Sequence, residues 1–101
     1  MKEIKMPDIN IKVGQTTEVE LKSIAASTGY SWVLVHKPDC LWLDDINYIY
    51  PEPPIPGKAG KVVFVFTGAA KCQDYVQFAQ VRHWDLEDMV QKITYALIIT
   101  E

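Results

Sequence analysis

Residues 93–100, with the sequence ITYALIIT, show the pattern that decides the fold. Every second side chain, beginning with Ile93, is large and apolar, and Thr94 and Thr100 lie among the residues between them. Successive side chains of an extended strand point to opposite faces, so this period of two predicts a long β-strand with one face in a core.

The same period of two recurs along the rest of the chain. Residues 9–13 and 19–21 alternate on either side of Gly14-Gln15, which predicts a hairpin of two strands. Residues 30–36 carry apolar groups on both faces and predict a central, buried strand. Three further strands are predicted within residues 41–50, 62–66 and 75–81, with Asp44-Asp45 as a break in the first of them.

The connections complete the prediction of the fold. Pro51 to Gly57 contains four prolines, which lack backbone donors, so this segment is a stiff loop. Residues 84–91 are polar and acidic and predict an excursion with one helical turn. Short strands without a long amphipathic helix favour an all-β fold, an immunoglobulin-like antiparallel β-sandwich of about seven or eight strands. A small closed barrel is the alternative, and the 101 residues predict one domain, 1–101.

Composition and charge exclude several classes of partner. Ten basic and thirteen acidic residues give a net charge of −3 without a block of like charge, which argues against nucleic acid and an anionic membrane surface. No stretch reaches the roughly 18 apolar residues that would span a bilayer. Residues 1–7 do not resemble a signal peptide, so we expect a cytoplasmic protein or the trimmed form of a secreted or lysosomal one.

The cysteines and histidines provide no sign of a metal site or an enzyme. Cys40 and Cys72 lack CxxC spacing, and His36 and His83 are far apart, so we expect no metal and no cofactor. We expect free thiols, with a single disulfide as the alternative. The strand count places both cysteines at the end of the sandwich opposite His83, which argues against a cysteine–histidine catalytic pair, and we expect no enzyme activity.

Strand direction predicts one functional surface. If seven strands alternate in direction, the second, fourth and sixth connections all lie at the same end of the sandwich. These connections are residues 24–29, 51–60 and 82–91. The prediction holds only if residues 41–50 form a single strand, because an extra strand would reverse the parity.

Each of these connections contains a short motif. The first ends in small residues followed by an aromatic, and the second also has few large side chains. The third begins with a forked cation and a tryptophan, residue types that are enriched in binding hot spots. The motifs are Ala25-Ala26-Ser27-Thr28-Gly29-Tyr30, Gly57-Lys58-Ala59-Gly60 and Arg82-His83-Trp84.

In order and placement these motifs resemble the chagasin family of cysteine-protease inhibitors, whose loops read N-P-T-T-G-(Y/F), G-x-G-G and R-P-W. The resemblance extends from about Val13 to Ile99. It keeps the Thr, Gly and aromatic positions of the first motif and the Arg and Trp of the third. The sequence departs from the family pattern at Ala25, Ala26, Ala59 and His83.

The resemblance implies a reversible, tight-binding inhibitor of papain-like cysteine peptidases that is monomeric when free. The three loops would straddle the active-site cleft, with Ser27 and Thr28 nearest the peptidase's catalytic cysteine. Tyr30 and Trp32 are expected to anchor their strand in the core rather than touch the target. The alternative is a non-inhibitory immunoglobulin-like binding or adhesion module that holds a ligand on Tyr48 and Tyr50.

Overall fold

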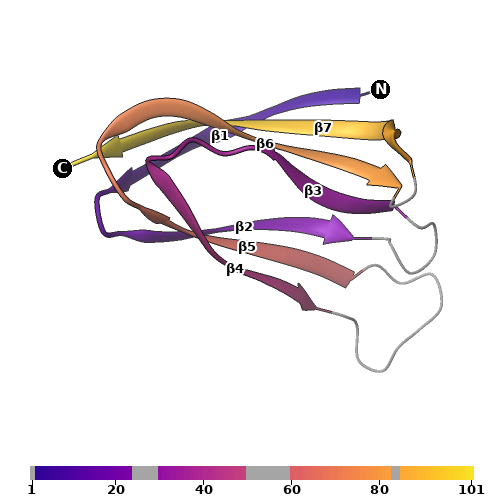
Figure 1. The fold of residues 1–101 in the computed structure, drawn as a ribbon, viewed down its shortest axis with the longest axis horizontal. Coiled ribbons are helices and arrows are strands. Elements are labelled where there is room, and N and C mark those ends of the chain that lie inside the picture. Colours follow the sequence, from indigo (N-terminus) through magenta and orange to yellow (C-terminus); the bar gives the residue numbers. More distant parts are fainter. Residues whose placement is uncertain (1, 24–29, 50–59, 83–84) are drawn as a thin grey trace.

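The computed structural model describes residues 2–23, 30–49, 60–82 and 85–101. These residues form an all-β sandwich of two sheets, with no helix in the described ranges and therefore none that could cross a membrane (Figure 1). The strands are β1 (Lys2–Lys12), β2 (Thr16–Ser23), β3 (Tyr30–His36), β4 (Leu41–Ile49), β5 (Gly60–Gly68), β6 (Cys72–Arg82) and β7 (Asp85–Thr100). The predicted antiparallel immunoglobulin-like class is confirmed.

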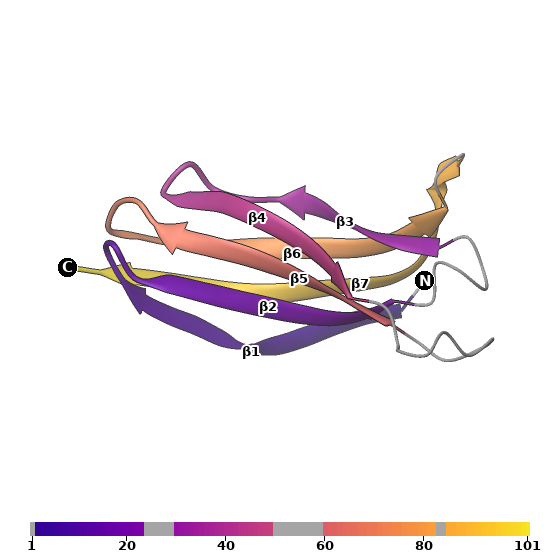
Figure 2. The ribbon, with the colours of Figure 1, turned by 90° about the horizontal axis from the view of Figure 1, so that it is seen from below.

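The strands divide into a four-stranded sheet, β1-β7-β6-β3, and a three-stranded sheet, β2-β5-β4. All neighbours are antiparallel except β1 and β7, which are parallel. In Figure 2, β2, β5 and β4 lie in front of β6 and β7 of the other sheet, and the strands of both sheets run in roughly the same direction.

The predicted hairpin of β1 and β2 is wrong. β1 pairs with β7 and β2 pairs with β5, so the chain crosses from one sheet to the other at residues 13–15. Gly14 makes the crossing with a φ of 86°, a region that glycine reaches without a Cβ clash. Its N–H donates to the carbonyl of Gly68 at 2.8 Å. Alternation of side chains identifies both strands, but it does not identify the neighbour that takes their backbone hydrogen bonds.

The two acidic stretches that the sequence marks as interruptions are both part of strands. β4 is a single strand whose register with β5 shifts between Leu43 and Asp45, so Asp44 is accommodated as a bulge. The expected helical turn in residues 84–91 is also wrong, because Asp85 onward belongs to β7 and pairs with the end of β6. Pairing with a neighbouring strand outweighs the weak strand propensity of acidic residues.

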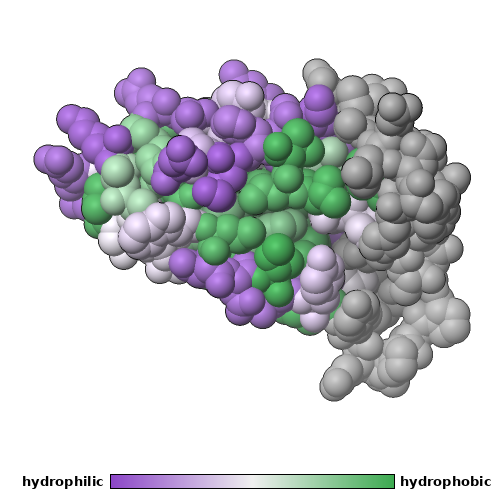
Figure 3. Space-filling model, in the orientation of Figure 1, coloured by the Kyte–Doolittle hydropathy of each residue, from purple (hydrophilic) through white to green (hydrophobic). Residues whose placement is uncertain are grey.

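The core lies between the sheets and is built on three phenylalanines. Phe64 and Phe66 of β5 face Phe78 of β6, with ring centroids 4.8 Å and 6.3 Å from that of Phe78. All three are almost completely buried. The alternation predicted for the last strand is confirmed, since Ile93, Leu97 and Ile99 of β7 are buried in the same cluster. The space-filling view shows apolar side chains across the middle of one face, between polar borders (Figure 3).

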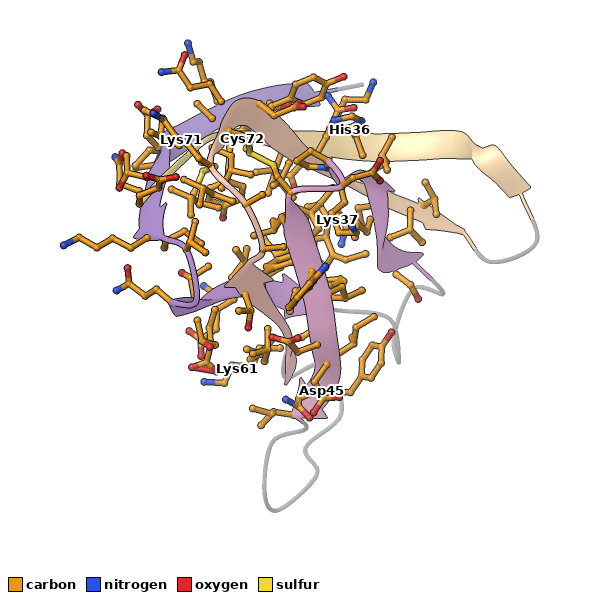
Figure 4. The ribbon with its side chains drawn as sticks, turned by 60° about the vertical axis from the view of Figure 1, so that its left-hand side comes forward. His36, Lys37, Asp45, Lys61, Lys71 and Cys72 are labelled. Carbon is orange, nitrogen blue, oxygen red and sulfur yellow. A yellow bond between two sulfur atoms is a disulfide. The ribbon has the colours of Figure 1, made fainter. Side chains whose placement is uncertain are left out.

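The two cysteines form a disulfide, so the expectation of free thiols is wrong. Cys40 ends the connection between β3 and β4, and Cys72 begins β6, with Cα atoms 6.4 Å apart (Figure 4). The two connections are also joined by the backbone, because Ala69 N–H donates to the carbonyl of Cys40 at 2.7 Å. Sequence spacing did not reveal this contact because it depends on where the third and fifth connections lie in space.

Candidate binding surface at one end of the sandwich

The strand ends that carry the three motifs lie together. In the three-stranded sheet, the end of β2 pairs with the start of β5 at Ser23 and Gly60, and the end of β4 pairs there at Ile49 and Lys61. In the four-stranded sheet, the start of β3 pairs with the end of β6 at Tyr30 and Arg82. Figure 1 shows that both sets of strand ends lie at the same end of the sandwich. β4 is a single strand, which the prediction of a shared end for the second, fourth and sixth connections required.

Only the borders of the three motifs fall within the described residues. Tyr30 is the first residue of β3, Gly60 the first of β5 and Arg82 the last of β6, so these motif residues belong to strands. The third connection is shorter than the predicted 82–91, because Asp85 already belongs to β7. The remaining motif residues lie outside the described part of the chain: Ala25, Ala26, Ser27, Thr28, Gly29, Gly57, Lys58, Ala59, His83 and Trp84.

Trp32 joins the two sheets directly behind this surface. Its side chain is buried, and its indole Nε1–H donates to the carbonyl oxygen of Lys22 at 2.6 Å. Lys22 lies one residue before the end of β2, and Trp32 is the third residue of β3. This bond therefore holds together the two strand ends between which the first motif lies. The expected core position of Trp32 is confirmed, but the sequence carries no signal for its bond to Lys22.

The outer face of the three-stranded sheet carries an ion pair near this end. Lys61, one residue into β5, pairs with Glu20 of β2 through a contact of 2.6 Å. Both side chains are about half exposed, so the pair contributes little to folding stability.

The opposite end contains the other histidine. His36 Nε2 lies 3.1 Å from Asp74 Oδ1, and its ring stacks on that of Tyr75 at a centroid distance of 4.1 Å. The backbone N–H of Tyr75 and the His36 ring together hold the pKa of Asp74 below its ordinary value of 3.8. Both cysteine sulfurs are joined in the disulfide, so neither supplies a thiol nucleophile for His36.

The alternative function, a binding or adhesion module, requires exposed aromatic side chains at Tyr48 and Tyr50, and the structure describes the first of them. Tyr48 of the edge strand β4 is about half exposed, as are its neighbours Ile46 and Ile49. Tyr50 lies outside the described residues. Among the described residues, no group of three or more histidine, cysteine, aspartate or glutamate side chains comes together in a form that could hold a metal.

The fold and this surface define a β-sandwich with three motif-bearing connections at one end, and comparisons with known proteins place it in a family. The profile described as Chagasin family peptidase inhibitor I42 matches residues 10–99. The chain therefore belongs to the chagasin family of peptidase inhibitors, which are not enzymes. A search of curated protein sequences found no match.

Solved structures share the fold at low sequence identity. The cysteine protease inhibitor EhICP2 from Entamoeba histolytica superposes with a TM-score of 0.78 at 16% identity, covering 97% of this chain and 94% of its own. PbICP-C, solved in complex with falcipain-2, gives a TM-score of 0.71 at 13% identity, covering 98% and 90%. Amebosin, solved in solution, gives 0.67 at 22% identity, covering 99% and 98%.

Proposed function

We propose that this protein is a reversible, tight-binding inhibitor of papain-like cysteine peptidases and that it blocks the active-site cleft with the three motif-bearing connections. The observation that carries the proposal is that six strand ends lie at one end of the sandwich. There β5 pairs with β2 and β4 in one sheet, and β6 pairs with β3 and β7 in the other. Membership of the chagasin family supports it, as does the neighbour PbICP-C, whose structure was determined with falcipain-2 bound.

The composition of the three motifs suits occlusion of a narrow cleft. Ala25, Ala26 and Gly29 have little or no side chain, so the backbone of this segment can approach the cleft walls and hydrogen-bond with them. Trp84 supplies a large apolar area with few rotatable bonds, and Arg82 supplies a forked donor. None of these groups is an activated nucleophile or electrophile, so the chemistry is that of a binding surface.

Titration of active papain with the protein tests the proposal. An inhibitor should abolish hydrolysis of a small peptide substrate near a one-to-one ratio, and activity should return on dilution. A serine peptidase assayed in parallel should keep its activity. Undiminished papain activity at a large excess of folded protein would contradict the proposal and favour the binding or adhesion module built on Tyr48.

A further inference from the structure

A hollow of about 440 Å³ opens between the two sheets, beside the edge strands β1 and β2. Its size lies within the range of about 300 to 1,000 Å³ that small-molecule sites occupy. Burial raises the pKa of the Tyr95 phenol in its wall, as an apolar setting requires. The apolar lining residues are Ile4, Met6, Leu21, Trp32, Ile93 and Tyr95.

A buried glutamine also lines this hollow. Gln80 of β6 is paired across the sheet with Trp32 of β3 and Gln91 of β7, so the three side chains form one row on the inner face. All three line the hollow, and Gln80 is only 7% exposed. Within the described part of the chain its side-chain amide has no hydrogen-bond partner, although buried amides are nearly always paired.

A second glutamine on the same strand shows the contrast. Gln77 lies three residues earlier on β6, on the outer face, and its Nε2 donates to the Thr94 hydroxyl at 3.0 Å. A residue of the neighbouring strand β7 can therefore accept a hydrogen bond from a glutamine of β6, as Thr94 does on the outer face of the sheet. The Gln80 amide lines the hollow instead, and no described residue takes the part that Thr94 has for Gln77.

We propose that this hollow binds a small neutral molecule with an apolar body and a single carboxamide-like group that hydrogen-bonds with Gln80. An amide offers one donor and one acceptor to the matching groups of Gln80, while the apolar walls take the rest of the ligand. The hollow lies behind the motif-bearing end of the sandwich, and its described lining contains none of the motif residues, so this binding goes beyond peptidase inhibition.

The ligand should be neutral because of where the charges lie. Among the described residues that line the hollow, Glu20 and Lys22 carry charge. Both alternate with the buried Leu21 on β2, so their side chains belong to the outer face of that strand, where Glu20 pairs with Lys61. A carboxylate placed beside Gln80 would lose its hydration without a cation next to it, which is costly in an apolar setting. A neutral amide avoids this cost.

Two probes of nearly the same shape, 2-naphthamide and 2-naphthoate, test the proposal. NMR titration of the native protein should show saturable shifts of the Trp32 indole N–H and the Gln80 side-chain amide with 2-naphthamide, with a dissociation constant of about 1 mM or lower. 2-Naphthoate should bind at least about tenfold more weakly. Absence of saturable shifts, or equal affinity for both probes, would overturn the proposal.

Two glutamine variants separate the site from nonspecific binding. Gln80→Leu should weaken 2-naphthamide at least about fivefold, the loss expected for two hydrogen bonds, whereas the matched outer-face variant Gln77→Leu should bind as the native chain does. If Gln80→Leu does not fold, Met6→Phe narrows the hollow from the β1 side and should also reduce binding. Unchanged affinity in the folded Gln80→Leu protein, or in Met6→Phe if that variant replaces it, would overturn the proposal.

Discussion

At the residue scale, Trp32 is the side chain on which the shape of the binding end most depends. It fills space between the sheets and donates to the Lys22 carbonyl from the neighbouring strand. A phenylalanine would keep most of the apolar contact but could not donate. The carbonyl of Lys22 would then lose its partner.

We therefore expect Trp32→Phe to lower the free energy of unfolding by about 1 to 3 kcal/mol, from the lost hydrogen bond and the smaller side chain. Urea unfolding followed by circular dichroism measures this. The matched control is Trp42→Phe, because Trp42 is 57% exposed and such a change should cost less than about 0.5 kcal/mol. Equal effects of the two substitutions would contradict the anchoring role of Trp32.

Trp84 belongs to the proposed peptidase contact, and its substitution should affect binding. An aromatic anchor contributes about 2 to 4 kcal/mol, so Trp84→Ala should weaken papain inhibition by roughly 30- to 1,000-fold while the protein stays folded. Trp42→Ala serves as the tryptophan control, since Trp42 lies near the start of β4 while the motif-bearing connection follows its end. Loss of folding in Trp84→Ala, with unchanged affinity of the folded fraction, would assign Trp84 to the core.

Asp74 makes stability depend on pH. Its pKa is lowered in the folded state, so its contribution to stability is present above the unfolded pKa, near 3.8, and is lost as pH falls through the lower folded value. Asp74→Asn should therefore be less stable than the native chain above about pH 4, and the difference should shrink at lower pH. Urea unfolding across this range checks the sign, with exposed Asp39→Asn as control; a constant difference would contradict it.

At the scale of elements, the disulfide joins the connections at the end of the sandwich opposite the binding surface. It links Cys40, before β4, to Cys72, at the start of β6, across a sequence separation of 32 residues. Its removal should loosen these connections without altering the strand ends at Ser23, Tyr30 and Gly60. Stability and binding should therefore respond differently to reduction.

The double substitution of Cys40 and Cys72 by serine should lower the free energy of unfolding by about 2 to 4 kcal/mol. The inhibition constant for papain should change less than about threefold under conditions where the variant is folded. Thermal unfolding and papain titration measure the two effects. The native protein in dithiothreitol provides a second comparison, and a parallel loss of affinity in the folded variant would show that the two ends are coupled.

At the scale of the whole molecule, the proposed inhibition is a binding event, because the side chains of the three motifs include no thiol and no activated nucleophile. Inhibition should therefore need neither the peptidase's catalytic thiol nor cleavage of the inhibitor. A papain variant with its catalytic cysteine changed to alanine should bind within about tenfold of the affinity of the active enzyme. Calorimetry measures this binding, and mass spectrometry after incubation with active papain should recover an intact chain. Cleavage within Ala25 to Tyr30 at the rate of binding would contradict the prediction.

The sequence alone identified the strands and the family. Side-chain alternation, as in Ile93 to Ile99, reflects the two faces of a strand and needs no knowledge of its partner. The strand count, with the assumption that successive strands alternate in direction, also predicted that the second, fourth and sixth connections share one end. The motifs around Gly29, Gly60 and Trp84 then indicated the function.

Only the tertiary structure decided which strands are neighbours. The separation of β1 from β2, the extension of β7 to Asp85 and the Cys40–Cys72 bond all depend on contacts between residues far apart in sequence. The bond from Trp32 to Lys22 arises in the same way, as does the position of the Gln80 amide, which has no partner among the described residues. Local pattern states which face of a strand is apolar, whereas backbone pairing between strands and packing between sheets decide what that face meets.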